Sequence, residues 1–168
     1  MISYSSGLVK RLLGLATASG DVVTVGGPNG LQGLTKLGVI SIFSGAAPTS
    51  ADAAATGTLL GQVTVAGVAY VVSTGANGLT LDNPTNTRTI SKPSGVVWTL
   101  KGSAPGTAGW FRYNGFNAAG DTNATDSSAA YVRIDGSCGI TSGDLRLTSV
   151  TIAIGSTATI DTFTITVA

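Results

Sequence analysis

The chain has 168 residues, a length that fits one domain with a sizeable core. Charged residues are 10% of the sequence and the formal net charge is +1, which gives no reason to expect a nucleic-acid or membrane partner, because both need a clustered basic face. The sequence contains no His, which excludes Ser-His-Asp and Cys-His catalysis, and Cys138 as the single Cys excludes a disulfide framework and a thiolate zinc site.

Composition also indicates the secondary structure and the kind of surface. Gly accounts for 24 residues, and every acidic residue is Asp, a type that favours turns over helices. Typical soluble proteins contain about 25% charged residues, so the surface of this chain is expected to present mainly hydroxyl, amide and backbone groups. A surface with so few charges favours association with other protein.

The first predicted element is a short amphipathic helix over residues 6–18. Leu8 and Leu12 fall on one face of this helix, and Ser6 is the candidate N-cap. Gly14 lies inside it and destabilises it by about 1 kcal/mol relative to Ala. The helix therefore needs contact with its own domain or with a partner in order to persist.

A Gly-rich connection follows the helix. Residues 25–33 read VGGPNGLQG, a composition typical of an extended connection. We therefore divide the chain into an N-terminal helix and Gly-rich arm, residues 1–33, and a compact domain, residues 34–168. Lys10 and Arg11 interrupt the apolar run of the arm, so it lacks the order of a secretory signal, and we expect synthesis in the cytoplasm. No apolar window is long enough to span a bilayer.

The compact domain shows apolar alternation that turn residues interrupt at regular intervals. Five segments are candidate strands: 39–45, 59–65, 96–102, 109–115 and 130–136. Residues 145–167 supply two or three more, and in the last of these, apolar side chains alternate with a ladder of Thr. The pattern predicts an all-β fold, a jelly-roll-like β-sandwich with about eight antiparallel strands.

Two segments depart from the alternation. PTSADAAATG at 48–57 has enough Ala for one helical turn or a tight loop. Residues 117–128 are polar or small throughout, which indicates an exposed loop. Within that loop the oxygen-bearing side chains of Asp121, Asn123 and Asp126 could begin a calcium loop, but the full ligand spacing and the downstream Glu are missing, so a solvated loop is favoured.

Paired carboxylates are the remaining route to catalysis in a chain without His. Each of the eight Asp residues lies in or beside a turn. A role in the turn explains the presence of each Asp without a catalytic role. We therefore predict that the chain is not an enzyme and has no catalytic, cofactor-binding or metal-binding residues and no cofactor. A metal-assisted enzyme built on Asp121 and Asp126 is the alternative.

The aromatic residues concentrate in the second half of the chain, above all in the stretch GWFRYNGFN. If their rings were exposed and coplanar, they would form a carbohydrate-binding face. We favour the alternative that Trp98 and either Trp110 or Phe111 are wedges in the core. The positions of Tyr113 and Phe116 stay open at this point.

Several short motifs occur in a specific order along the chain. The segment IFSGAAPTSADAAATGTLLGQVT is followed in the carboxyl-terminal half by GWFRYNGFNAAGD and then by YVRIDGSCGITSGDLRLTSVTIAIGSTATIDTFTIT. In this order they resemble a family of small tailed-bacteriophage virion proteins. The resemblance covers residues 38–168, and residues 1–37 match more loosely.

The resemblance implies a structural virion protein, most simply a capsid decoration or cement protein that stabilises the head by binding across capsomer junctions. Its partners would be the major capsid protein and copies of itself, in a homo-oligomer that is a trimer or a dimer. Its location would be the capsid surface of the virion, with no nucleic acid or membrane bound. A tail or fibre module that binds a receptor or a carbohydrate is the alternative.

Six residues are candidate partner-binding residues: Leu8, Lys10, Arg11, Leu12, Pro48 and Asp52. The four in the arm would reach a neighbouring subunit, and a helix folded back on its own domain is the equal alternative. The other two belong to residues 48–57, where small side chains would form a corner that lets another backbone approach closely.

Overall fold

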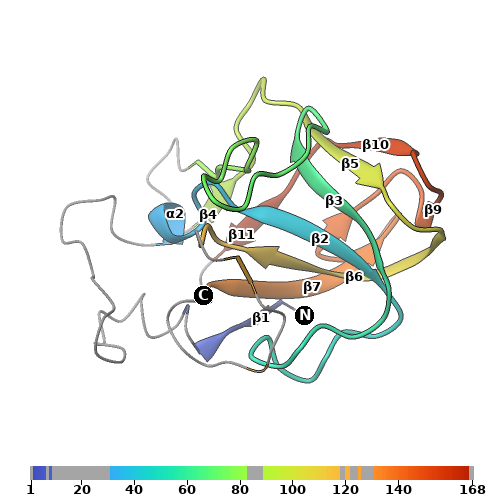
Figure 1. The fold of residues 1–168 in the computed structure, drawn as a ribbon, viewed down its shortest axis with the longest axis horizontal. Coiled ribbons are helices and arrows are strands. Elements are labelled where there is room, and N and C mark those ends of the chain that lie inside the picture. The colour runs from blue at the N-terminus through green and yellow to red at the C-terminus, as the bar shows by residue number, and fades with distance from the viewer. Residues whose placement is uncertain are drawn as a thin grey trace.

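The computed structural model describes residues 2–6, 8, 31–82, 89–117, 120–121, 125 and 131–166. Figure 1 shows a broad sheet that crosses the molecule, with short strands behind and around it. The elements in chain order are β1 (Ser3–Tyr4), α2 (Leu31–Leu34), β2 (Val39–Ser44), β3 (Leu59–Val65), β4 (Thr89–Ser91), β5 (Trp98–Gly102), β6 (Gly106–Asn114), β7 (Arg133–Gly139), β8 (Leu145–Arg146), β9 (Thr151–Ile152), β10 (Thr157–Ile160) and β11 (Thr164–Thr166).

Nine strands form one sheet with β2 at its centre, between β3 and β6. The order across this large sheet is β1-β7-β6-β2-β3-β5-β10, while β8 pairs with β7 and β9 with β6. The second sheet has two strands, β4 and β11. All these pairings are antiparallel except the pairing of β7 with β8. The all-β prediction is confirmed, whereas the jelly-roll connectivity stays a prediction.

The core lies between the large sheet and the two-stranded sheet. Ile40 and Ile42 of β2 are fully buried, as are Phe111 and Tyr113 of β6, because side chains two apart in a strand point to the same face. Phe163, just before β11, packs its ring against the rings of Trp98, Phe111 and Tyr113. The inner face of the large sheet is therefore sealed by the chain segment that leads into the small sheet.

The strands that the sequence predicted lie close to the observed ones. Four of the five candidate segments contain the starts or centres of β2, β3, β5 and β6, and the fifth overlaps β7. The last segment is more divided than expected, because residues 145–166 hold four short strands. The Thr ladder of the last strand is exposed, and Thr89 and Thr166 share a hydroxyl hydrogen bond of 2.8 Å across the small sheet.

The described part of the amino-terminal segment packs onto the domain. Ser3 and Tyr4 pair with Asp135 and Ile134 of β7, and the Leu8 side chain is fully buried in the core. The Leu8 N–H donates to Ser5 Oγ, so the cap of this first turn is Ser5 and not Ser6. Residues 9–30, with most of the predicted helix and Gly-rich connection, lie outside the described residues.

The segment that joins β2 to β3 turns back over the large sheet as a tight loop. Its turn closes with a hydrogen bond of 3.0 Å from the Ala53 N–H to the Ser50 carbonyl. At Gly57, where φ is 79°, an added Cβ would overlap the carbonyl oxygen of Ser44. Glycine is needed there because both the backbone conformation and the close approach exclude a side chain. No helix in the parts of the chain described here has the length and apolar character to cross a bilayer.

Candidate functional site

The outer face of the large sheet, opposite the core, carries polar and charged side chains. On β6 this face presents Trp110, Arg112 and Asn114, which alternate with Phe111 and Tyr113 on the core face. One end of the face lies beneath the β2–β3 loop, and the other end is open. The covered end holds a network of buried charges, and the open end forms a groove.

Arg112 and Asp135 form a buried ion pair at the covered end. They lie directly opposite each other on β6 and β7, and the Arg112 side chain is only 2% exposed. Arg112 Nε donates to Asp135 Oδ1 at 2.8 Å, and its Nη2 donates to Oδ2 at 2.7 Å. Its Nη1 donates to the Ala53 carbonyl at 2.9 Å, so the pair also holds the loop above it.

A second buried arginine, Arg133, repeats the arrangement beside the first. Its Nε and Nη2 donate to the two carboxylate oxygens of Asp121, each at 2.6 Å. Its Nη1 donates to the carbonyls of Ala51 and Asp52 at 3.4 and 3.3 Å, and its guanidinium lies over the Tyr131 ring at 4.9 Å. Bidentate pairing of this kind fixes orientation as well as charge.

The two arginines with their two carboxylates are called the clamp below: Arg112, Arg133, Asp121 and Asp135. The clamp ties three consecutive backbone carbonyls of the β2–β3 loop to the sheet. A buried charge that loses its partner costs several kcal/mol, so the loop position is strongly determined. This accounts for the run of Ala at its tip, because the small side chains let the loop backbone reach the guanidinium groups.

The predicted partner-binding residues are not brought together by the described structure. Leu8 is buried in the core of its own chain. Asp52 accepts hydrogen bonds from the Ser6 N–H at 2.9 Å and from the Ser6 hydroxyl at 2.6 Å. Pro48 lines a cavity of about 420 Å³ between the loop and β1. Three candidates, Lys10, Arg11 and Leu12, lie outside the described residues.

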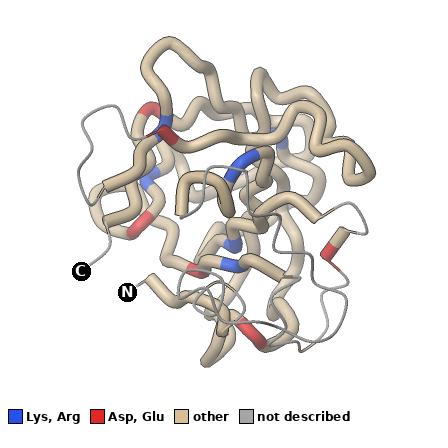
Figure 2. The backbone as a smooth tube through the Cα atoms, turned by 90° about the vertical axis from the view of Figure 1, so that its left-hand side faces the viewer, with Lys and Arg blue, Asp and Glu red and all other residues tan. Residues whose placement is uncertain are grey.

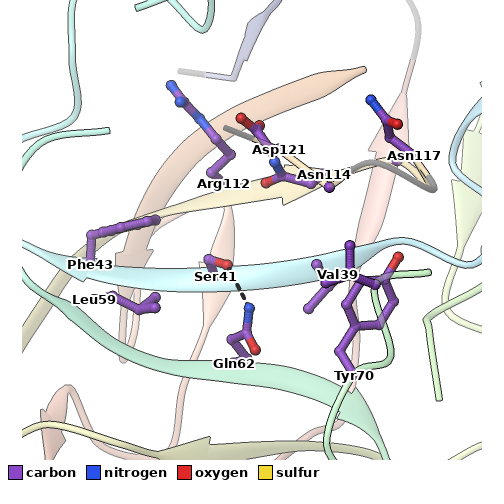
Figure 3. A pocket seen from close by; sticks show the side chains of 13 residues that line it. Val39, Ser41, Phe43, Leu59, Gln62, Tyr70, Arg112, Asn114, Asn117 and Asp121 are labelled. Carbon is purple, nitrogen blue, oxygen red and sulfur yellow. Dashed lines mark hydrogen bonds between the residues drawn. The ribbon is translucent and has the colours of Figure 1, made fainter. Parts of the chain in front are cut away.

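The open end of the outer face is a groove of about 290 Å³. It crosses the strands β3, β2 and β6, and Figure 3 shows its side chains over the central strand. The lining residues are Val39, Ser41, Phe43, Leu59, Gln62, Tyr70, Val72, Arg112, Asn114, Gly115, Asn117, Gly120 and Asp121. Two clamp residues thus form part of the groove wall.

The prediction that Trp98 and either Trp110 or Phe111 lie in the core is confirmed, with Phe111 as the second core residue. Trp98, Trp110, Phe111 and Tyr113 are all buried, so they do not form a carbohydrate-binding face. The Tyr113 hydroxyl donates to the Thr35 carbonyl at 2.5 Å, and burial raises the Tyr113 pKa far above its usual value. It therefore stays a hydrogen-bond donor.

The sequence did not lead to a prediction of the clamp. The stretch FRYN and the stretch YVRID each place an Arg on the polar side of an alternating strand, and this was the available signal. The partners of Arg112 could not be identified in the same way, because Asp135 and Ala53 are 23 and 59 positions away from it.

Two of the Asp carboxylates considered for catalysis or metal binding, Asp121 and Asp144, have structural partners. Asp121, proposed as the start of a calcium loop, is held by Arg133 and by the Asn114 side-chain amide, while Asn123 and Asp126 lie outside the described residues. Asp144 accepts hydrogen bonds from the N–H and the hydroxyl of Ser137; burial opposes its charge, yet these bonds hold its pKa below the usual value. Among the described residues, no three His, Cys, Asp or Glu side chains gather as metal ligands do.

Cys138 is expected to react slowly with iodoacetamide in the folded protein. Burial, together with the nearby Asp144 carboxylate, raises the Cys138 pKa to about 12, and the thiolate is the reactive form. At about pH 8 we expect alkylation on the order of 100-fold slower than in the urea-unfolded chain, measured by mass spectrometry over time. Equal rates in the folded and unfolded protein would contradict this.

Comparisons with protein-family models, with curated proteins and with solved structures give no match for this chain.

Proposed function

We propose that this chain is a structural protein of a tailed-bacteriophage virion, which decorates the capsid and stabilises the head by binding across capsomer junctions. The resemblance of residues 38–168 to small virion proteins supports the proposal through the order of its motifs. The partners would be the major capsid protein and further copies of this chain.

The observation that carries the proposal is the clamped β2–β3 loop. The clamp uses buried ion pairs to hold a loop of small residues, which is the same segment that carries much of the resemblance. Ala46 and Ala47 near its start are exposed. Alanine has no side-chain rotamers to lose on binding, and a rigid loop avoids the entropy cost of ordering. Such a loop is suited to close contact with another protein backbone.

The distribution of charge supports the same proposal. Figure 2 shows few charged positions on the described backbone, of both signs and scattered. Three of the four clamp side chains are buried, so the surface carries even fewer charged side chains than the sequence contains. The centres of protein interfaces are depleted in charged residues, and this surface has that character.

A decoration protein of this kind would act through the number of its contacts. Each copy that binds the assembled shell, and not the free capsid subunits, stabilises the shell by mass action. Copies linked in a dimer or trimer engage several capsid sites at once, which raises their avidity without new contacts. Outward pressure then has to break more contacts before the shell opens.

The proposal is tested with the phage that encodes this chain. Particles that lack the chain are expected to lose infectivity or release DNA at a lower temperature or a smaller osmotic shock than complete particles. Immunogold labelling should place the chain on the heads. Labelling confined to tails or fibres would contradict decoration, and unchanged particle survival would contradict a stabilising role.

A pair of matched variants tests the loop itself. Ala47→Arg places a long charged side chain on the exposed part of the loop, and Ala153→Arg makes the same change at an exposed position in the β9–β10 turn. We expect the first to reduce rebinding of purified protein to depleted particles by at least about tenfold, and the second to have little effect. Equal loss or equal retention in both would count against the loop as the contact.

The second candidate function is a tail or fibre module that binds a receptor or a carbohydrate. Most of the aromatic residues that first suggested it are buried, and of that stretch only Phe116, at 37%, is exposed among the described residues. The groove on the outer face is the observation that still favours ligand binding.

A further inference from the structure

We propose that the groove on the outer face of β3, β2 and β6 binds a neutral sugar, as one unit of a larger glycan. The proposal concerns a site that is separate from the exposed loop and does not depend on where in a virion the chain resides. It rests on the order of side chains along the groove, on their charges and on the strands that form its floor.

Side chains of different character follow one another along the groove. Figure 3 shows Phe43 and Leu59 at one end, Ser41 and Gln62 in the middle, and Val39 with Tyr70 at the other end. The Leu59 side chain is 40% exposed, so the apolar end is accessible. A pyranose ring also combines apolar C–H faces with a rim of hydroxyls, and aromatic rings such as that of Tyr70 pack against such faces.

The charges at the groove cancel in pairs. Arg112 and Asp121 are the charged lining residues. The first is paired with Asp135 and the second with Arg133. An anionic or cationic ligand would therefore lose its hydration without gaining an unpaired counter-charge. A neutral ligand has no such cost.

The polar groups of the groove are held in place and keep hydrogen-bonding capacity. Gln62 donates its amide N–H to Ser41 Oγ at 3.3 Å, and Asn114 donates its amide N–H to Asp121. The carbonyl oxygens of these two amides have no hydrogen-bond partner among the described residues and can accept from a ligand. Each of these amides also carries a second N–H that can donate, whereas Arg112 is 2% exposed and makes its three N–H bonds inside the protein. Fixed donors and acceptors side by side match a ligand whose hydroxyls do both.

The floor of the groove disfavours an extended peptide as the ligand. Such peptides bind by adding a strand to an open sheet edge through main-chain hydrogen bonds. β2 is already paired with β3 on one side and with β6 on the other, so its main chain is fully used by the sheet. Recognition here has to come from side chains. The volume, at the small end for ligand sites, fits roughly one sugar ring.

The experiment uses the full-length protein on an array of neutral and acidic oligosaccharides. The best-bound terminal sugar is then titrated, as its methyl glycoside, into isotope-labelled protein and followed by NMR. We expect selective binding of neutral glycans, with shifts at Ser41, Gln62 and Tyr70. An empty array, stronger binding of acidic glycans, or shifts confined to another surface would overturn the proposal.

Two matched comparisons locate the site. Gln62→Met removes the groove amide, while Gln32→Met makes the same change in α2, where the exposed amide donates to Asp82. We expect affinity for the glycan to fall about tenfold in the first and to stay unchanged in the second. Tyr70→Ala should weaken binding similarly, whereas Tyr70→Phe keeps the ring and should retain binding although it loses the hydrogen bond to the Leu37 carbonyl.

Other results would overturn the assignment to the groove. Unchanged affinity in Gln62→Met, with the melting temperature of wild type, would place the sugar elsewhere. If the array is empty but Gln62→Met loses binding to depleted particles, the groove is a protein contact and the sugar proposal fails. Head labelling in the virion test is measured separately, so the two proposals can fail independently.

Discussion

Replacing Arg112 with Met is expected to lower the free energy of unfolding by about 3 to 5 kcal/mol. The substitution leaves the Asp135 carboxylate, which is 2% exposed, without the two N–H donors that pair with it. It also removes the donor to the Ala53 carbonyl. Urea unfolding followed by Trp fluorescence measures the loss.

The double variant Arg112→Met with Asp135→Leu tests whether the stability is lost because the Asp135 charge is left unpaired. Because both charges are then absent, we expect it to recover a large part of the stability that the single variant loses. Hydrogen exchange of residues 51–53 reports on the loop, and it should be faster in both variants because the donor to Ala53 is gone in each. A single variant within about 1 kcal/mol of wild type would contradict the buried pair as described.

Replacing Phe163 with Ala is expected to lower the free energy of unfolding by about 3 to 5 kcal/mol, through a different mechanism. The ring is 2% exposed and packs on the rings of Trp98, Phe111 and Tyr113. Its removal leaves a cavity between the large sheet and the segment that leads into β11. Thermal and urea unfolding both measure the effect.

Phe116→Ala is the matched control for this substitution. Its side chain is 37% exposed, so the same change should cost less than about 1 kcal/mol. Phe163→Leu keeps most of the apolar volume and should fall between the two. Similar losses at both Phe positions would contradict the core position of Phe163.

The alternation along single strands predicted which side chains face the core, but not burial as such, because Trp110 and Arg112 on the opposite face of β6 are also buried. In β6 and in the last strand, apolar residues at every second position face the core, as their spacing indicated. This information is local, because successive side chains of a strand point to opposite faces. It sufficed for the all-β class, but it left open whether Trp110 or Phe111 joins Trp98 in the core, and the structure places Phe111 there.

The division of the chain was less predictable near its beginning. The sequence placed Ser3 and Tyr4 in an arm, but the described structure pairs them with β7 at the edge of the large sheet. A two-residue strand carries no periodicity of its own. Its pairing depends on an edge that another part of the chain supplies, more than 120 positions later.

The sequence by itself determined the class of fold, the faces of its strands and the exclusion of His-based chemistry. Only the tertiary structure decided which charges meet. Arg133 reaches Asp121 and the carbonyl of Ala51, which are 12 and 82 positions away, and the groove takes its lining from three neighbouring strands and two loops. The physical reason is that alternation is a property of one strand, whereas register and neighbours are set by the packing of the whole chain.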